Sequence, residues 1–262
     1  MTAIHGRPLW YELACAPGRR AEAEAFYAGL FGWTVAPSGM EGFDYDLARC
    51  QGAMVAGIMD MPADVAGMPP LWLIYFGVAD LDVAVAAATA QGAAIHRPPF
   101  EVANTGRIAI LGDPQGAGFG LLEPGPMQDG TGGNAFDRTR AGHGNWNELM
   151  TADPAAALDF YGRLLGWQQS TEIPMGEMGT YQLFAHEGAD IGGMQGLGNA
   201  PAPAWLPYFG FNGLSDAVAR IADLGGAVLH GPQEVPGGAH IAIARDPQGA
   251  QFAIVGPLDH AG

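Results

Sequence analysis

Short apolar runs alternate with turn residues along the whole chain, and one arrangement of them occurs twice. The five residues Asp113–Ala117 stand between two apolar runs, and the same five letters, Asp-Pro-Gln-Gly-Ala, return between two apolar runs at Asp246–Ala250. Asp accepts hydrogen bonds from nearby backbone N–H groups, Pro fixes φ, and Gly supplies a positive φ. A turn of this composition flanked by apolar residues predicts a β-hairpin.

The residues that precede each hairpin are repeated as well. Trp10–Leu13 corresponds to Trp146–Leu149, and Ala25–Trp33 corresponds to Asp159–Trp167. The separation is about 134 residues, far longer than the repeat of a solenoid protein. We therefore predict a duplicated domain and not an array of short repeats.

The duplication divides the chain of 262 residues into two domains of ordinary size. We place them at residues 5–124 and 143–257, joined by a Gly-rich linker at residues 125–142. The linker has no apolar periodicity, so it should run over the surface. Each domain is long enough to bury a core without disulfides or metal ions.

Within each domain the pattern predicts a helix that is followed by several strands, twice. In the first helix, Phe26 and Leu30 are four residues apart and form an apolar stripe, and Gly32 ends the helix. After Asp80 the same order of elements repeats, with an Ala-rich helix and strands that include the hairpin. Each half-domain is therefore a βαβββ module, and four modules give an α+β fold with antiparallel-rich sheets. The elements that the apolar runs of the first domain indicate are strands near Leu9–Cys15, Asp44–Cys50, Ala53–Met59 and Leu71–Val78, and helices near Arg19–Phe31 and Asp82–Gln91.

Composition and charge narrow the classes of function. The 27 acidic and 11 basic residues give a net charge of −16, which repels phosphate backbones and anionic membranes, so we expect neither nucleic acid nor membrane as a partner. No apolar run approaches transmembrane length, and the N-terminus lacks a signal-peptide pattern. Cys15 and Cys50 lack a CxxC spacing and are expected to be reduced, buried thiols, which fits a cytoplasmic location.

These motifs resemble those of the vicinal-oxygen-chelate (VOC) superfamily, which includes glyoxalase I, bleomycin-resistance proteins, fosfomycin-resistance proteins and extradiol dioxygenases. The resemblance covers nearly the whole chain, and it looks closest to the tandem two-domain members. It implies that two modules pair so that their curled sheets form one open cleft in each domain. The motifs that carry the resemblance are Phe-Tyr in the first helix of each half (Phe26-Tyr27 and Phe160-Tyr161), the segment Val78–Asp82 before the second helix, and the Asp-Pro-x-Gly hairpin.

The resemblance also implies where a divalent metal would bind. In the family the ligands are His, Gln or Glu residues on the first, fifth and eighth strands. The residues at these positions here lack donors that Zn²⁺, Mg²⁺ or Fe²⁺ could use. We therefore predict no metal and no other cofactor, while a metal held by displaced ligands stays an alternative. The corresponding positions are Trp10, Leu73 and Gly120 in the first domain and Trp146, Leu206 and Ala253 in the second.

Side chains near those positions define the candidate ligand sites. Because alternate residues of a strand face the same side, Glu12 should face the first cleft together with Trp10. Glu148 should face the second cleft in the same way. A carboxylate among apolar residues needs a partner or takes up a proton, so Glu12 and Glu148 are the candidate general bases. The other residues expected to bind a ligand are Trp10, Leu73, Tyr75 and Arg107 in the first cleft and Trp146, Leu206, Tyr208 and His240 in the second.

Each of these residues also has a purely structural interpretation. Trp and Tyr in strands commonly pack within a sheet or core. Glu12 has the alternative role of a structural link to a backbone N–H or to Arg107. His96 and His230 precede Pro-containing bends and are expected to be exposed or hydrogen-bonded. Glu123, at the end of the eighth strand, is expected to point away from the ligand face.

Three functional interpretations stay open. The first is a metal-free protein, similar to bleomycin-resistance proteins, that binds a small aromatic or carbonyl-containing molecule for detoxification or resistance. The second is a lyase, isomerase or dioxygenase-type enzyme that uses Glu12 or Glu148 as base, or a metal at shifted positions. The third is an assembly platform. The first interpretation is favoured because the residues at the three metal-ligand positions cannot bind a metal. The expected partner is then a small molecule. The protein is expected to be either a monomer with paired domains or a homodimer.

Overall fold

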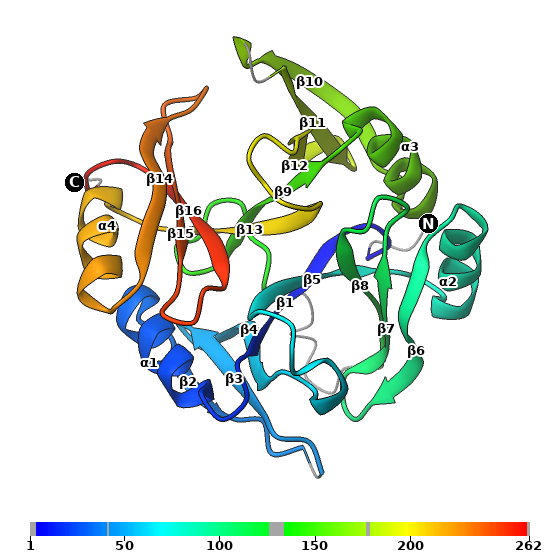
Figure 1. The fold of residues 1–262 in the computed structure, drawn as a ribbon, viewed down its shortest axis with the longest axis horizontal. Helices are drawn as coiled ribbons and strands as arrows, with labels where there is room; N and C mark the ends of the chain where they lie inside the picture. Colours follow the sequence, from blue (N-terminus) through cyan, green and yellow to red (C-terminus); the bar gives the residue numbers. More distant parts are fainter. Residues whose placement is uncertain (1–3, 41, 126–133, 177–178, 261–262) are drawn as a thin grey trace. The chain divides into compact units, whose positions relative to one another are not determined.

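The computed structural model describes residues 4–40, 42–125, 134–176 and 179–260. Over these residues it contains four α-helices and four βαβββ modules in chain order, which confirms the predicted α+β class (Figure 1). The first two modules consist of β1 (Pro8–Cys15), α1 (Arg20–Phe31), β2 (Thr34–Pro37), β3 (Tyr45–Cys50), β4 (Ala53–Asp60), a 3₁₀ turn (Ala63–Val65), β5 (Leu71–Gly77), α2 (Leu81–Ala90), β6 (Ala94–Val102), β7 (Gly106–Gly112) and β8 (Gly118–Pro124). The last two consist of β9 (Gly144–Thr151), α3 (Pro154–Leu165), β10 (Gln168–Pro174), β11 (Thr180–His186), β12 (Ala189–Gly196), β13 (Ala204–Gly210), α4 (Leu214–Asp223), β14 (Ala227–Glu234), β15 (His240–Arg245) and β16 (Gln251–Gly256).

Every module arranges its four strands in the same order. In the first module the order is β2-β3-β4-β1, where β1 and β4 run parallel and the other neighbours run antiparallel. The orders β5-β8-β7-β6, β10-β11-β12-β9 and β13-β16-β15-β14 repeat this scheme. Antiparallel pairs therefore predominate, as predicted. Strands β2 and β10 lie at sheet edges with mostly exposed side chains, which is why no apolar run in the sequence marks them.

The helix ends follow the local chemistry of the sequence. The Asp153 side chain accepts a hydrogen bond from the backbone N–H of Ala156, and Pro154 occupies the first turn of α3. Gly166 ends α3 with a φ of 75°, and Gly32 ends α1 with a φ of 69°. This left-handed conformation favours glycine because it has no Cβ.

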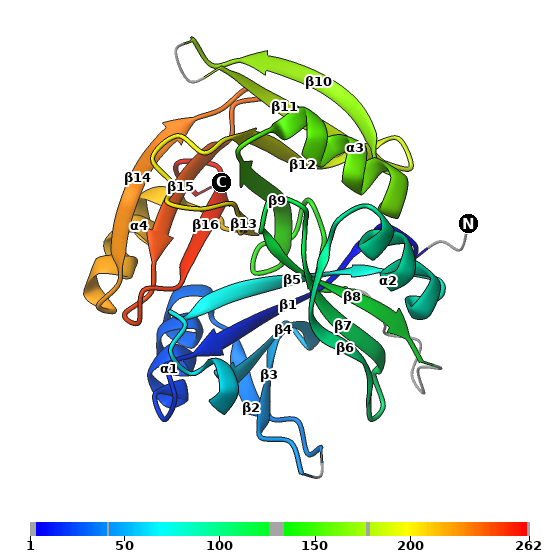
Figure 2. The same cartoon turned by 45° about the vertical axis from the view of Figure 1, so that its right-hand side comes forward.

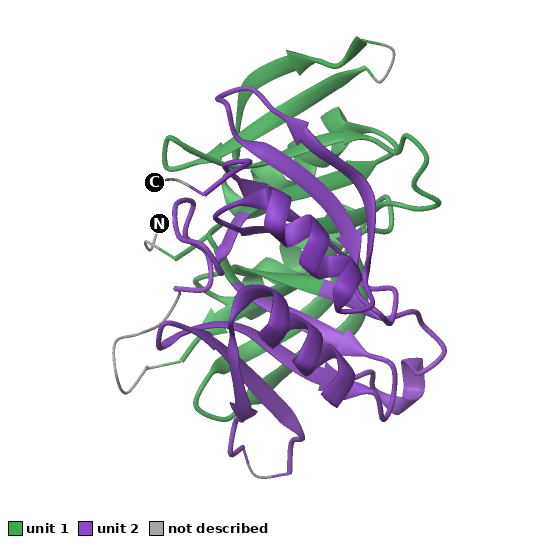
Figure 3. Ribbon diagram, turned by 90° about the vertical axis from the view of Figure 1, so that its left-hand side faces the viewer, with its two compact units in different colours: residues 1–9, 73–133, 146–206 green, residues 10–72, 134–145, 207–262 purple. Residues whose placement is uncertain are grey.

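The chain forms two compact units, and each draws on both halves of the sequence (Figure 3). Unit 1 comprises the described residues of Met1–Leu9, Leu73–Gly133 and Trp146–Leu206, and therefore contains most of the second and third modules. Unit 2 comprises those of Trp10–Trp72, Asn134–Asn145 and Pro207–Gly262, with most of the first and fourth modules. Helices α2 and α3 are neighbours within unit 1 (Figure 2), as α1 and α4 are within unit 2.

The predicted domains at residues 5–124 and 143–257 stay a prediction. Part of the predicted linker, residues 126–133, lies outside the described residues.

In unit 1 the repeated turn joins β7 to β8 and is hydrogen-bonded to helix α3. The Asp113 carboxylate accepts hydrogen bonds from the backbone N–H groups of Gln115 and Ala117, at 2.8 and 3.0 Å, as its turn chemistry predicts. Its other oxygen accepts the Tyr161 hydroxyl at 3.1 Å. The Gln115 amide accepts from the N–H of Asp153 at 2.7 Å and donates to the carbonyl of the same residue at 2.8 Å. The turn therefore holds both the beginning and the middle of α3.

Unit 2 repeats these contacts with the second turn and helix α1. The Asp246 carboxylate accepts from the N–H groups of Gln248 and Ala250 and from the Tyr27 hydroxyl, at 2.8, 3.0 and 3.2 Å. The Gln248 amide accepts from the N–H of Ala16 at 2.9 Å and donates to the carbonyl of Arg19 at 2.7 Å. In both units, a turn from one half of the sequence thus binds a helix from the other half.

Aromatic side chains fill the core around these two tyrosines. Trp205 donates its indole N–H to Tyr161 in unit 1 at 3.0 Å, and Trp72 donates to Tyr27 in unit 2 at 2.9 Å. Both tyrosines are fully buried, and the pKa of each phenol is well above its ordinary value. Burial is the largest cause, and the charge of the nearby Asp carboxylate is the second largest. The phenols therefore remain neutral donors to the carboxylates.

We expect substitutions in the repeated turn to destabilise the fold in proportion to burial. Asp113→Ala and Asp246→Ala leave buried N–H and O–H donors unpaired and should each lower the free energy of unfolding by about 3 kcal/mol. Gln115→Ala and Gln248→Ala affect more exposed groups and should cost about 1 kcal/mol. Urea unfolding measures these changes.

Gln91→Ala is the matched control for these variants, because the Gln91 amide donates to Ala87 in its own helix, on the surface. Its effect should stay within about 0.5 kcal/mol. Turn variants that unfold at the same urea concentration as this control would contradict the role of the turn.

Candidate functional site

Strand β1 alternates its faces as the sequence predicts. Tyr11 and Leu13 are fully buried, whereas Trp10 and Glu12 on the opposite face are only half-buried. The third module has Trp146 and Glu148 at the corresponding positions of β9.

On this face of the first module, Trp10, Tyr45 and Glu12 form a chain of hydrogen bonds. The Trp10 indole N–H donates to the Tyr45 hydroxyl at 2.7 Å. The Tyr45 hydroxyl in turn donates to Glu12 Oε2 at 3.0 Å. A phenol oxygen can accept one hydrogen bond while its proton makes another, so Tyr45 connects an indole donor to a carboxylate acceptor.

The third module has the same three residue types at the corresponding positions, and it shares the first of these hydrogen bonds. The Trp146 indole N–H donates to the Tyr181 hydroxyl at 2.8 Å, and Glu148 lies close enough to this phenol for its charge to raise the phenol pKa. We refer to Trp10–Tyr45–Glu12 and Trp146–Tyr181–Glu148 as the first and second triads. Here a further donor is present, because the Gln195 amide donates to Glu148 Oε1 at 3.1 Å.

A glycine beneath each tyrosine makes the triad possible. Gly57 on β4 pairs with Glu12 in the parallel ladder, and a Cβ added there would lie 1.7 Å from the Tyr45 hydroxyl oxygen. Gly193 on β12 pairs with Glu148, and a Cβ there would lie 2.3 Å from the Tyr181 ring. In each case the phenol crosses the intervening strand over a residue without a side chain.

Both triad tyrosines stay protonated across the ordinary pH range. Burial is the largest cause that raises the pKa of Tyr45 well above its usual value, followed by the charge of Glu12. Burial and the charge of Glu148 act in the same way on Tyr181. Each triad therefore keeps its proton on the phenol, beside the carboxylate.

The predicted fifth- and eighth-strand positions are apolar and closely packed. In unit 1, Leu73 and Tyr75 are buried, and a Cβ added at Gly120 would lie 2.1 Å from the Tyr75 ring. A Glu side chain at position 120, as a metal-binding family member would have, does not fit beneath this ring. The corresponding residues Leu206, Tyr208 and Ala253 are likewise buried, and Tyr208 pairs with Ala253.

Arg107 lies with α2 and not where the alternation count places it. Its guanidinium donates to both carboxylate oxygens of Asp82 in the first turn of α2, at 2.8 and 2.9 Å, and to Glu123 at 3.4 Å. Arg107 pairs directly with Glu123 across the β7–β8 ladder, so the two share a face. Glu123 accepts the N–H of Leu81 at the start of α2, which fits its predicted direction away from the ligand face. The assignment of Arg107 to the cleft side is therefore wrong.

The predicted histidines have different surroundings. His240, the counterpart of Arg107, begins β15 opposite Gly256, and its Nδ1 is a buried atom without a hydrogen-bond partner among the described residues. His230 is exposed and hydrogen-bonded to Gln233, as expected. His96 is also exposed, on the edge strand β6.

Tyr45 and Tyr181 are the site residues that sequence reasoning missed. A signal for them exists, because each tyrosine follows its tryptophan by 35 residues, in both copies. Strand alternation alone cannot indicate that a side chain reaches over a neighbouring strand.

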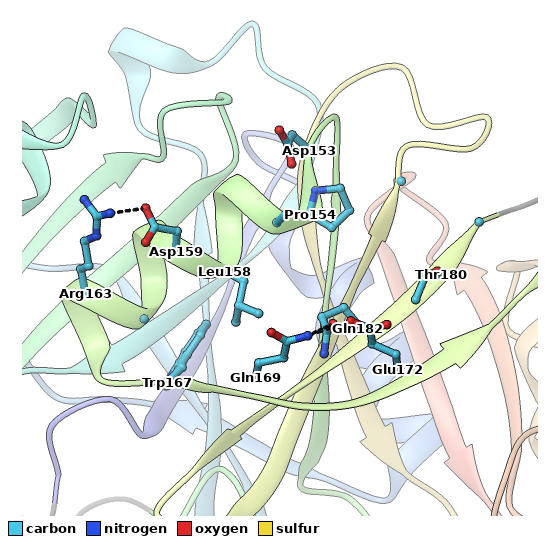
Figure 4. A pocket seen from close by; sticks show the side chains of 14 residues that line it. Asp153, Pro154, Leu158, Asp159, Arg163, Trp167, Gln169, Glu172, Thr180 and Gln182 are labelled. Carbon is cyan, nitrogen blue, oxygen red and sulfur yellow. Dashed lines mark hydrogen bonds and ion pairs between the residues drawn. The ribbon is translucent and has the colours of Figure 1, made fainter.

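A separate groove opens beside helix α3 in unit 1 (Figure 4). Its volume is about 790 Å³, and Trp167 and Leu158 lie beside the polar side chains of Gln169 and Gln182. Gln169 donates to both Glu172 and Gln182, at 2.7 and 3.0 Å, so the polar groups in the groove are hydrogen-bonded to one another. No motif in the sequence indicates this groove.

The chemistry of these residues does not fit the metal site that the fold family implies. Among the described residues, no three His, Cys, Asp or Glu side chains are close enough together to hold a metal ion. The first two strand positions that would supply ligands are Trp and Leu in both copies. The third is Gly in the first copy and Ala in the second. These side chains offer no N, O or S donor that Zn²⁺, Mg²⁺ or Fe²⁺ could use.

Successive βαβββ modules are the architecture that the resemblance to the VOC superfamily implies. The sequence matches the family described as "Glyoxalase/Bleomycin resistance protein/Dioxygenase superfamily" over residues 14–121 and 140–254. The chain belongs to this superfamily.

Relatives extend over almost the entire chain. "Putative glyoxylase CFP32" of Mycobacterium tuberculosis is 33% identical over 96% of this chain and 95% of its own. "Anthracycline biosynthesis protein DnrV" of Streptomyces peucetius is 32% identical over 95% of this chain and 93% of its own. Among solved structures, the 2,3-dioxygenase LapB from Pseudomonas sp. KL28 matches with a TM-score of 0.67 at 15% identity, covering 99% of this chain and 96% of that chain. The Mn(II)-bound glyoxalase from Novosphingobium aromaticivorans matches with a TM-score of 0.65 at 14% identity, covering 98% and 84%. These two structures share the fold.

We predict that Gly57→Ala and Gly193→Ala disrupt the triads. The added methyl group overlaps the Tyr45 hydroxyl or the Tyr181 ring, and such overpacking should lower the free energy of unfolding by about 1–3 kcal/mol. The near-ultraviolet circular dichroism of tyrosine and tryptophan should change with it.

Gly196→Ala is the control for Gly193→Ala, because it lies on the same strand and its added Cβ meets nothing within 4 Å. It should leave stability and spectrum unchanged. Triad variants that behave like this control would disprove the proposed packing.

Proposed function

We propose that the protein binds a small aromatic or carbonyl-containing molecule, without a metal, on the strand face that presents Trp10 and Glu12 or on its counterpart with Trp146 and Glu148. The observation that supports this proposal best is the triad itself. Both copies have an indole that donates to a phenol, and this phenol lies beside a carboxylate.

The triad supplies two complementary contacts for such a ligand. The half-buried indole is fixed by its hydrogen bond to tyrosine and offers a flat apolar surface. Stacking on it contributes roughly 0.5–1.5 kcal/mol beyond area burial. A hydrogen bond from a ligand O–H or N–H to the carboxylate contributes about 1.5–3 kcal/mol. With apolar burial added, these contacts suit micromolar affinity.

The comparisons and the charge favour a small organic ligand over a macromolecular partner. One relative carries anthracycline biosynthesis in its name and another glyoxylase, and both names refer to small-molecule chemistry. The net charge of −16 disfavours nucleic acid. No helix of the described segments is long and apolar enough to cross a membrane. Cys15 and Cys50 are free and buried, which supports a reducing, cytoplasmic environment.

The second candidate function is catalysis with Glu12 or Glu148 as general base. The triad favours it because a carboxylate that is oriented by a phenol can accept a proton next to a ligand carbonyl. A lyase or isomerase reaction matches this chemistry, and glyoxalase and dioxygenases are among the proteins that share the fold. Turnover of a bound carbonyl compound, lost in Glu12→Gln or Glu148→Gln, would support this function.

Binding is tested by titration of Trp fluorescence with flat aromatic ligands, including para-hydroxyacetophenone and the dihydroxyanthraquinone alizarin. We expect micromolar binding of at least one of them. At least one of Glu12→Gln and Glu148→Gln should weaken it about tenfold, the effect of one hydrogen bond to a charged group. Asp190→Asn is the control, because Asp190 lies near the start of β12 and belongs to neither triad. Unchanged affinity in both Glu variants and in the Trp10→Ala and Trp146→Ala variants would refute the proposal.

The absence of a metal is tested separately. Elemental analysis of protein purified without a chelating tag should find far less than one Ni, Zn, Mn or Fe per chain. The physical reason is that the three strand positions offer no suitable donors. A stoichiometric metal would support the alternative with displaced ligands, and its loss in Glu12→Ala would then identify the site.

A further inference from the structure

The two triads consist of the same residue types but differ in what surrounds the carboxylate. Glu148 is only 4% exposed, whereas Glu12 is half-buried. The Gln195 amide donates to Glu148 at 3.1 Å. The residue that corresponds to Gln195 in the first module is Met59, which has no N–H or O–H to donate.

Strand register places Met59 beside the first triad. Gly57 pairs with Glu12, and Met59, two residues further along β4, pairs with Ala14. Residues two apart in a strand share a face, so Met59 lies on the same face as Glu12. A thioether in this place is apolar and adapts its shape to a neighbouring group.

A second difference is aromatic. Phe43 stacks on Tyr45 with ring centroids 5.5 Å apart and an angle of 27° between the rings. Its side chain is 41% exposed, so a large apolar ring is open to solvent directly beside the first triad. The corresponding residue of the third module is Gly179, which has no side chain.

From these differences we propose that the first triad is the ligand-binding copy, and that the carboxylate of the second triad is a structural group fixed by Gln195. This inference rests on the proposed function and assigns it to one copy. The ligand of the first triad is a flat aromatic compound with a hydroxyl or N–H group. Its ring stacks on the Trp10 indole and extends toward Phe43 and Met59, and its polar group donates to Glu12.

Chemical labelling tests the assignment without any ligand. Carbodiimide activation in the presence of glycine ethyl ester converts accessible carboxylates to amides, and peptide mass spectrometry measures the rate at each residue. Glu12 should be labelled about tenfold faster than Glu148, because Glu148 is buried and holds a charge-assisted hydrogen bond from Gln195. Equal rates, or faster labelling of Glu148, would overturn the proposal.

Exchanging the two differing residues provides the matched variants. Gln195→Met should raise the labelling rate of Glu148, and Met59→Gln should lower that of Glu12, each about fivefold or more, as expected for one such hydrogen bond. Far-ultraviolet circular dichroism verifies that both variants are folded. If neither exchange changes its own carboxylate, Gln195 does not make the difference and the proposal is wrong.

A binding experiment with alizarin separates this inference from the proposed function. Phe43→Ala and Glu12→Gln should weaken alizarin binding about tenfold, while Glu148→Gln should leave it unchanged. Phe100→Ala is the control, because Phe100 is similarly exposed at 40% but lies on β6. Loss of binding in Glu148→Gln alone would overturn this inference and leave the proposed function standing. Absence of any binding by the panel would refute the proposed function, and the labelling rates would still decide which carboxylate is accessible.

Discussion

A buried Asp carboxylate that accepts a tyrosine hydroxyl holds each compact unit together. Asp113 binds Tyr161, and Asp246 binds Tyr27, and in each pair the two residues come from different halves of the sequence. A carboxylate in a core is stable only if its oxygens are hydrogen-bonded. The backbone N–H groups of its own turn and the phenol satisfy this need together, so the turn and the helix depend on each other. The duplicated sequence therefore needs both copies to complete either unit.

The triads apply the same chemistry on a strand face. A buried phenol with a raised pKa is a permanent donor, and a carboxylate is its natural acceptor. In the core this pair closes a contact between elements, whereas on β1 and β9 the phenol lies beside a carboxylate on one face of the strand. Gly57 and Gly193 are the structural requirement, since any side chain there would displace the tyrosine.

Patterns of the sequence predicted the modules, the helix ends and the two faces of β1, because periodicity and turn chemistry are local properties. The functions of Gln115 and Gln248 were not predictable, since their partners lie 38 and 229 to 232 residues away in the chain. Arg107 was assigned to the wrong face because alternation does not reveal an ion pair with Asp82 on a helix. Tyr45 was missed for a related reason: its partners are on strands that only the folded register brings together. The edge strands β2 and β10 bury too little apolar surface to leave a pattern.

Duplication explains why the triads can be alike and still differ in function. The hydrogen bonds of a triad stabilise its module whether or not a ligand binds, so stability alone retains them in both copies. Access to the carboxylate has no such structural value, and residues around it are free to diverge. Gln195 in place of Met59 adds a donor that stabilises Glu148 in its buried position, and Gly179 in place of Phe43 removes an aromatic surface. A shared scaffold with different surroundings is therefore what one expects when one copy keeps a binding role and the other keeps only its contribution to the fold.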